Sequence, residues 1–165
     1  LEAPDLPFGL GSGAGTIYGT TGGVAEAVVR HCMPDKSRNT LRALEYSPLR
    51  GNESIREATI PVGDREIKLA VVHGLINAQK LLKEIDEGTA YYDLIEVMTC
   101  PNGCVGGAGQ PYGLKAKKQA RSAGLYATDR SAPFKRAEYN PGVTSILQKL
   151  THEQRHELLH VSYQK

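Results

Sequence analysis

The sequence predicts an α/β fold in which a small mixed sheet, a hairpin plus a parallel crossover strand, is flanked by helices. Residues 55–62 and 66–73 carry strand patterns on either side of Gly63-Asp64, which is a tight-turn pair. Residues 75–87 place apolar side chains at helical spacing, and residues 92–98 form a third apolar run. Because a helix separates the second and third runs, we expect a right-handed crossover that makes these two strands parallel.

The strands and the helix of this unit can be oriented from the same patterns. Pro61 has no N–H to donate, which places the first strand at an edge of the sheet. The second strand is continuously apolar in its second half, as expected for a strand that enters a core. Gly88 is expected to cap the helix. The helical residues expected to face the sheet are Ile76, Leu81, Leu82 and Ile85.

The segments outside this unit predict loops and further helices. Residues 1–21 and 46–53 are expected to be loops, and residues 40–44 a short turn of helix. Thr151 with Gln154 resembles a capping box at the start of the last helix. The remaining helices are expected at residues 22–31, 113–122, 142–150 and 151–160.

Composition excludes several classes of function. A chain of 165 residues fits one domain, and no run approaches ~18 apolar residues, so we expect no membrane span and no signal peptide. A net charge of +2 gives no reason to expect a nucleic-acid partner. Three cysteines, an odd number, favour a reducing compartment over a disulfide framework. We expect the basic cluster on residues 115–121 to be a solvated helix face rather than a docking patch for an acidic electron carrier.

Two cysteines lie in the most distinctive segment, just after the third strand. Cys100 and Cys104 are followed by a loop that is almost without side chains, with glycine at positions 103, 106, 107 and 109. Thiolates ligate iron, and the exposed N–H groups of such a loop stabilise the negative charge of an iron–sulfur cluster. In an open α/β sheet this carboxyl edge is where ligands bind. A redox pair and a structural zinc site are the alternatives, although zinc usually needs a second ligand pair nearby.

A second glycine-rich segment, residues 9–30, precedes the sheet. Its spacing does not match a phosphate-binding loop, because no Gly-Lys-Ser/Thr follows the glycines. It does not match a dinucleotide fingerprint either, because no clear strand precedes it. We therefore expect this segment to pack around the cluster site.

The two segments together resemble the C-terminal part of the large-subunit catalytic domain of the iron-only (FeFe) hydrogenases. The third cluster signature of that family reads roughly E-x-M-x-C-x-x-G-C-x-x-G-G-G-Q-P. It is matched by Glu96, Met98, Cys100, Gly103, Cys104, Gly107, Ala108, Gly109, Gln110 and Pro111. The upstream family segment is matched by Gly13, Gly15, Ile17, Tyr18, Gly19, Thr21, Gly22, Gly23, Val24, Glu26, Ala27 and Arg30.

The resemblance implies roles for individual residues. Cys100 would ligate a 4Fe–4S cube, and Cys104 would bridge that cube to a two-iron subcluster, the pair forming the H-cluster. Met98 would pack beside the two-iron unit as a catalytic-site residue. The other cofactor-binding positions implied are Gly103, Gly107, Gln110 and Tyr18, the last of which is usually Phe in the family.

The resemblance also implies that much of the site lies elsewhere. The family has two further cysteine signatures, T-S-C-x-P and M-P-C-x-x-K-x-x-E, and neither occurs in this chain. We therefore expect residues 1–165 to be the C-terminal lobe of a hydrogenase domain, a fragment that lacks the cluster and is inactive alone. Its expected partners are the N-terminal half of the same domain and a ferredoxin-like or other electron carrier.

The parent protein would interconvert protons, electrons and dihydrogen, in the cytoplasm of an anaerobic bacterium. The alternative is a non-catalytic hydrogenase-like iron–sulfur protein, acting in cytosolic Fe–S assembly or in hydrogen sensing.

Two further groups of side chains are of residue types that can bind a metal. Cys32 follows an apolar helical run, and we expect it to be a buried or half-buried core residue. His152, His156 and His160 are spaced like a metal-binding stripe on a helix. We favour instead a terminal helix in which His160 is packed.

Overall fold

A three-stranded mixed sheet organises the chain. The computed structural model describes residues 9, 11–35, 37–45 and 47–161. Strand β1 (Ile55–Val62) pairs antiparallel with β2 (Arg65–His73), and β2 pairs in parallel with β3 (Leu94–Met98). The order β1-β2-β3 leaves β1 at an edge, as Pro61 predicts, and β3 at the other edge. The predicted α/β class and the parallel third strand are both confirmed.

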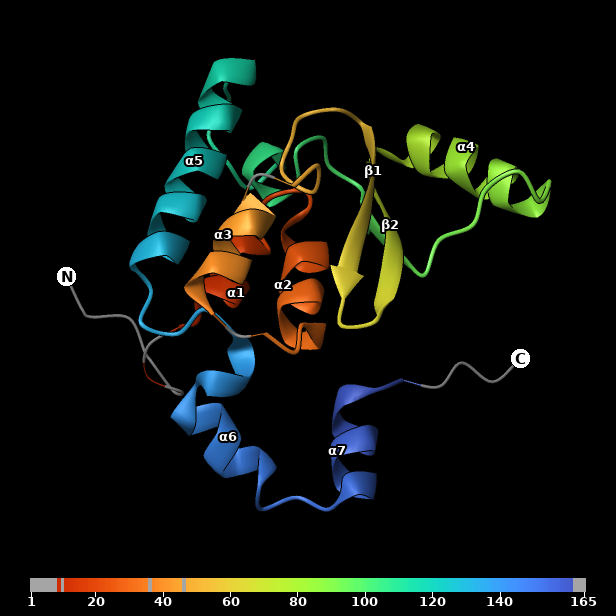
Figure 1. Ribbon diagram of the computed structural model, residues 1–165. Coiled ribbons are helices and arrows are strands. Elements are labelled where there is room, and N and C mark those ends of the chain that lie inside the picture. Colours follow the sequence, from red (N-terminus) through yellow and green to blue (C-terminus); the bar gives the residue numbers. More distant parts are fainter. Residues whose placement is uncertain (1–8, 10, 36, 46, 162–165) are drawn as a thin grey trace.

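Helices cover the two faces of this sheet (Figure 1). Most of the predicted helices are present within a residue or two, but α5 continues well past residue 122 and α3 is longer than the expected turn. The bounds are α1 (Gly13–Ile17), α2 (Gly23–Cys32), α3 (Arg38–Glu45), α4 (Leu75–Asp86), α5 (Lys115–Ser131), α6 (Pro141–Leu147) and α7 (His152–Leu159), with short 3-10 turns η1 (Cys104–Gly106) and η2 (Ala137–Tyr139).

Helix α1 lies where a loop was predicted. Ser12 caps its N-terminus, because the Ser12 hydroxyl accepts a hydrogen bond from the Gly15 N–H at 3.1 Å. Its five residues include one large apolar side chain, the buried Ile17, so the segment has no hydrophobic period that a sequence pattern reveals. The prediction for residues 1–8 and 10 lies outside the described residues.

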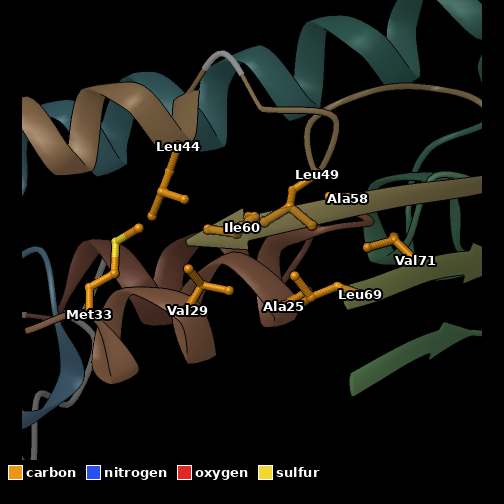
Figure 2. Packing of buried hydrophobic residues seen from close by; sticks show 9 residues of the cluster. All are labelled: Ala25, Val29, Met33, Leu44, Leu49, Ala58, Ile60, Leu69 and Val71. Atoms are coloured by element: carbon orange, nitrogen blue, oxygen red, sulfur yellow. The ribbon is translucent and has the colours of Figure 1, made fainter. Parts of the chain in front are cut away.

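The larger core lies between α2, α3 and the sheet. Figure 2 shows side chains from α2, from α3 and the loop after it, and from β1 and β2 converging on one apolar layer. Burial of an aliphatic side chain of this size stabilises the fold by about 1.5–3 kcal/mol. The buried members are Ala25, Val29, Met33, Leu44, Leu49, Ala58, Ile60, Leu69 and Val71.

Helix α4 packs on the opposite face of the sheet through a narrower stripe than predicted. Ala78 and Leu81 are buried against Ala70 and Val72 of β2, and Ile85 is half-buried. Ile76 and Leu82, both expected to face the sheet, are exposed. The residues that contact the sheet are spaced three to four apart and so share one face of the helix. Ile76 and Leu82 lie outside that face. Gly88 follows the helix with φ of +70°, as expected for its capping position.

The carboxyl-terminal helices extend below the sheet layers in Figure 1. Thr151 and Gln154 form the predicted capping box of α7. His160 is exposed rather than packed, because α7 has no buried residue on either face. No helix in the described part of the chain combines the length and apolarity needed to cross a membrane.

Cys32 is exposed at the end of α2, contrary to the expectation of a core residue. The buried apolar stripe of α2 runs through Ala25, Val29 and Met33, four residues apart, and Cys32 lies beside it. A second buried stripe of the same helix is ionic, formed by Glu26 and Arg30, so hydrophobic spacing does not reveal it.

Candidate functional site

The two glycine-rich segments meet at the carboxyl edge of the sheet. The Val105 N–H donates to the Gly19 carbonyl at 3.0 Å, and the Thr21 N–H donates to the Asn102 carbonyl at 3.1 Å. These backbone bonds join the cysteine loop, residues 99–111, to the turn between α1 and α2. Residues more than 80 positions apart in the sequence thus form one surface. The sequence predicts this packing of the upstream segment against the cysteine loop.

Glu96 anchors the cysteine-bearing strand to helix α2. Its carboxylate is buried; Oε1 accepts the Gly22 N–H at 2.6 Å, and Oε2 accepts the Ala25 N–H at 2.7 Å. The first N–H groups of a helix have no intrahelical partner and carry partial positive charge, which a carboxylate satisfies. The sequence places Glu96 in the motif but gives it no role; its signal is a carboxylate inside an otherwise apolar strand.

The cysteine loop holds both thiols free of any disulfide. Cys100 is half-buried in the turn that follows β3, and Cys104 is exposed at the start of η1. A Cβ atom placed on Gly107 would lie 3.5 Å from the Cys100 sulfur. A side chain at position 107 would thus make an ordinary van der Waals contact with this thiol, which shows that the loop passes near the Cys100 side chain.

Gly103 is required by the geometry of the loop. Its φ is +84°, a region that favours glycine, and it follows Asn102, which also has positive φ. A Cβ on Gly103 would come within 2.8 Å of the Thr21 nitrogen and 2.9 Å of the Met98 sulfur. Gly103 thus lets the cysteine loop, the upstream segment and Met98 come together at one point.

The remaining residues expected at the site lie around this loop. Met98 ends β3 and is half-buried, with its sulfur beside Gly103. Tyr18 is 48% exposed and precedes Gly19, the residue that pairs with Val105. Gln110 is exposed, and its N–H donates to the Gly107 carbonyl at 3.1 Å.

Arg121 of α5 supports the cysteine loop from the side. Its guanidinium donates to the Val105 carbonyl at 2.9 Å and to the Pro111 carbonyl at 2.5 Å. The expectation of a solvated basic face holds for Lys115 and Lys117, which are exposed, but not for Lys118 and Arg121, which are half-buried. The sequence pattern does not reveal this difference, because helical spacing shows which residues share a face but not which of them contact the rest of the fold.

A buried ionic cluster fixes the elements behind the loop. Arg30 donates to both oxygens of Asp129, at 2.8 and 2.7 Å, and to Glu26 at 2.6 Å. Arg50 donates to both oxygens of Glu26 at 2.7 Å. Burial alone lowers the pKa of Arg30, but the hydrogen bonds and charges of Asp129 and Glu26 outweigh it and raise the pKa. Two arginines and two carboxylates balance in charge, which reduces the cost of burying them.

A second polar layer lies beneath the site, on the α2 face of the sheet. His73 ends β2 in register with Met98, and its ring is buried, with Nε2 lacking a hydrogen-bond partner among the described residues. Burial, and then the charge of Arg56, lower the pKa of His73. The Arg56 guanidinium itself reaches Thr21 at 3.3 Å and the Leu49 carbonyl at 3.2 Å. Both side chains connect the sheet to the loops that carry the site.

The thiols of Cys100 and Cys104 are suitable ligands for iron, but they make up only part of a cluster site. The two thiols lie four positions apart on a glycine-rich loop and form no disulfide, and thiolates are the soft ligands that iron–sulfur clusters use. Within the described residues, no group of three or more His, Cys, Asp or Glu side chains is placed to hold a metal ion. A four-ligand cluster would therefore need two ligands from outside this part of the chain.

The fold and this loop define an α/β lobe that carries two free thiols at the carboxyl edge of its sheet. Comparison with known proteins specifies the family. The model of the iron-only hydrogenase large subunit, C-terminal domain, matches residues 1–108. The model of the iron hydrogenase small subunit matches residues 115–165. The chain belongs to the iron-only hydrogenase family.

Individual relatives agree with this assignment. The NADP-reducing hydrogenase subunit HndD of Solidesulfovibrio fructosivorans is 38% identical over 98% of this chain and 28% of its own length. Cytosolic iron–sulfur assembly component 3 of Mus musculus is 33% identical over 88% of this chain and 31% of its own length. The solved structure of [FeFe]-hydrogenase HydA1 from Chlamydomonas reinhardtii matches with a TM-score of 0.68 at 33% identity, covering 98% of this chain and 50% of that one.

The chain therefore spans half of the matched HydA1 chain and about a third or less of these curated relatives. Its fold is that of one part of a larger hydrogenase domain.

Proposed function

We propose that this chain is the C-terminal lobe of an iron-only hydrogenase that reversibly converts protons and electrons to dihydrogen. In this role it supplies Cys100 and Cys104, two of the four cysteines that hold the H-cluster. The supporting observation is the junction of the two glycine-rich segments, which places both free thiols on a loop built from bare backbone. The chain alone is then a half-site, inactive and without a stable cluster.

The residues of this chain would act by holding and shielding the cofactor. Cys100 would ligate the 4Fe–4S cube and Cys104 would link it to the two-iron subcluster, and the H-cluster, when bound, supplies the electron and dihydrogen chemistry. Met98 would keep water away from the two-iron unit with an apolar thioether. Glu96 would fix the position of the cysteine loop relative to α2 through its two hydrogen bonds to backbone N–H groups at the start of that helix. Gly103 and Gly107 would let the backbone approach the cluster.

Tyr18 and Gln110 complete the proposed surroundings of the cofactor. The Tyr18 side chain is exposed next to Gly19, and we propose that its hydroxyl makes a hydrogen bond at the site. Gln110 is likewise exposed at the end of the cysteine loop. Their exposure supports the proposal that both contact a group that this chain does not itself contain.

A non-catalytic role in iron–sulfur assembly or in hydrogen sensing is the second candidate. The similarity to cytosolic iron–sulfur assembly component 3 supports it. The intact Met98 and the Gln110-Pro111 end of the loop favour the hydrogenase. The cysteine signatures of the complementary half discriminate the two, because a catalytic two-iron site needs both.

Anaerobic reconstitution with iron and sulfide tests the proposed function. We expect the isolated chain to bind well below one 4Fe–4S cluster per chain by absorption and iron content. Mixed with the half of the domain that carries the other two signatures, taken from the same genome, it should bind one. C100S and C104S should abolish this gain, whereas C32S, which removes the exposed cysteine of α2, should not. A stable, stoichiometric cluster on the isolated chain would contradict the proposal.

The cellular setting and the electron carrier follow from the same proposal. We place the protein in the cytoplasm of an anaerobic bacterium, with a ferredoxin-like carrier as its electron partner. Its free thiols and the cytosolic relative support the compartment. The relatives also include the periplasmic [Fe] hydrogenase large subunit of Nitratidesulfovibrio vulgaris, so fractionation of the native cells is the deciding measurement.

A further inference from the structure

Helix α7 carries a histidine pattern that the proposed function does not use. Residues 152–156 and 156–160 each read H-E-x-x-H, so three histidines follow one another at intervals of four residues. On a helix this spacing places consecutive side chains on one face, one turn apart. A pair of histidines so placed is a recurrent zinc-binding arrangement. Packing does not account for the pattern here, because all three side chains are exposed.

The rings of His156 and His160 already lie against each other. They are stacked, with their centroids 4.7 Å apart and their planes inclined by 25°. Two imidazoles that bind one tetrahedral zinc ion have their centroids about 5 Å apart, given the usual Zn–N distance. The backbone therefore holds these rings at nearly the separation that a shared ion needs. Since both rings are exposed, rotation of their side chains can turn a nitrogen of each toward the ion without disturbing a core.

The charges around the histidines favour a cation. The three histidines and the carboxylates of Glu153 and Glu157 line one open surface pocket, to which no lysine or arginine of the described residues contributes. Arg155, the single arginine of the helix, donates instead to the Leu150 carbonyl at 3.2 Å. An ion bound by the histidines would therefore lie near two negative charges, which attract it.

A bound ion would also supply a stabilisation that the core does not give this helix. Helix α7 has eight residues and none of them is buried. A helix of this length is marginal in water without tertiary packing. The capping box of Thr151 and Gln154 stabilises its first turn. A metal ion that links positions 156 and 160 would stabilise its last turn.

We propose that His156 and His160 bind a zinc ion that fixes the carboxyl-terminal turn of α7. Water fills the other coordination positions, because in the part of the chain that the structure describes no third His, Cys, Asp or Glu side chain is placed to join the pair. The site is therefore a clamp on the helix and not the three-ligand centre of a metallohydrolase. It uses neither Cys100 nor Cys104, so it is independent of the proposed function.

Titration with zinc chloride against a chromogenic chelator tests the site in the complete chain. The variant C32S/C100S/C104S serves as the parent, because free thiolates are themselves zinc ligands. It should bind one zinc ion per chain, and magnesium should not compete, since Mg²⁺ prefers oxygen ligands. H156A and H160A, made in this parent, should each weaken zinc binding at least about tenfold, because a single imidazole ligand remains.

Two matched variants of the same parent show whether the effect belongs to this pair. H31A removes an exposed histidine at the end of α2 and should leave zinc binding unchanged. H152A removes the third histidine of α7 and should weaken binding far less than H160A does. The inference is overturned if the parent binds no zinc, if H160A binds zinc as the parent does, or if H31A or H152A weakens binding as much as H160A.

Hydrogen exchange measures the clamp on the helix directly. The His160 N–H donates to the His156 carbonyl at 2.9 Å, so this amide reports on the last turn. In the same parent it should exchange more slowly with zinc than with magnesium, and H156A should abolish the difference. Zinc binding without slower exchange at this amide would overturn the structural role. None of these outcomes affects the proposed function, which depends on Cys100 and Cys104.

Discussion

Substitution of Glu96 by glutamine tests how the cysteine loop is held in place. E96Q keeps the size of the side chain but replaces one acceptor oxygen with an NH2 group. One of the two N–H groups, Gly22 or Ala25, would then face a donor in a buried site. A hydrogen bond to a charged group contributes about 1.5–3 kcal/mol, and a carboxylate at a helix N-terminus adds about 0.3–1 kcal/mol. We therefore expect a loss of about 3 kcal/mol in the free energy of unfolding.

Urea denaturation followed by circular dichroism measures this loss. With a slope of about 2 kcal/mol per molar urea, the midpoint should fall by about 1.5 M. E66Q, at an exposed position of β2, is the matched control and should leave the midpoint within about 0.3 M of the unmodified chain. A midpoint for E96Q equal to that of E66Q would refute the idea that this carboxylate anchors α2 to β3.

Three further predictions concern residues around the site. Burial and the charge of Arg56 lower the pKa of His73, so the unfolded chain binds this proton at a higher pH than the folded chain does. The free energy of unfolding should therefore decrease as the pH falls below about 6.5. H73N should flatten that part of the pH dependence, measured by urea midpoints between about pH 7.5 and 5.5. G23A should destabilise the chain by about 3 kcal/mol in the same assay, because its Cβ would lie 1.7 Å from the Ile17 carbonyl oxygen. R121Q should speed alkylation of Cys104 several-fold, since two bonds that hold the loop are lost.

Each of these three predictions has a control within the chain. H31N removes an exposed histidine from the end of α2, and an equal flattening there would contradict the assignment to His73. G124A in α5 meets no atom within 4 Å, so it should be neutral or stabilising by up to about 1 kcal/mol. K117Q changes an exposed charge on α5, and the Arg121 prediction is wrong if K117Q speeds alkylation to the same extent.

Local patterns in the sequence were sufficient for the sheet and its crossover helix. The turn at Gly63-Asp64, the helical period after residue 75 and the third apolar run fixed a hairpin and a parallel strand, because backbone pairing depends on periods of two and 3.6 residues that are visible locally. The same holds for the capping box of α7, in which both partners lie within one turn. The position of the loop that carries Cys100 and Cys104 was also predicted, since the loop directly follows the third apolar run.

Tertiary structure alone decided which polar side chains hold that loop. Glu96 bonds to nitrogens more than 70 positions away, and Arg30 reaches Asp129 at a separation of 99 residues. Neither pairing leaves a period in the sequence, because a buried charge finds its partner by the approach of whole elements. The exposure of Cys32 and Leu82 could not be predicted from the sequence for a related reason. An apolar stripe on a helix indicates that one face is buried, but only the position of the sheet determines how wide that face is.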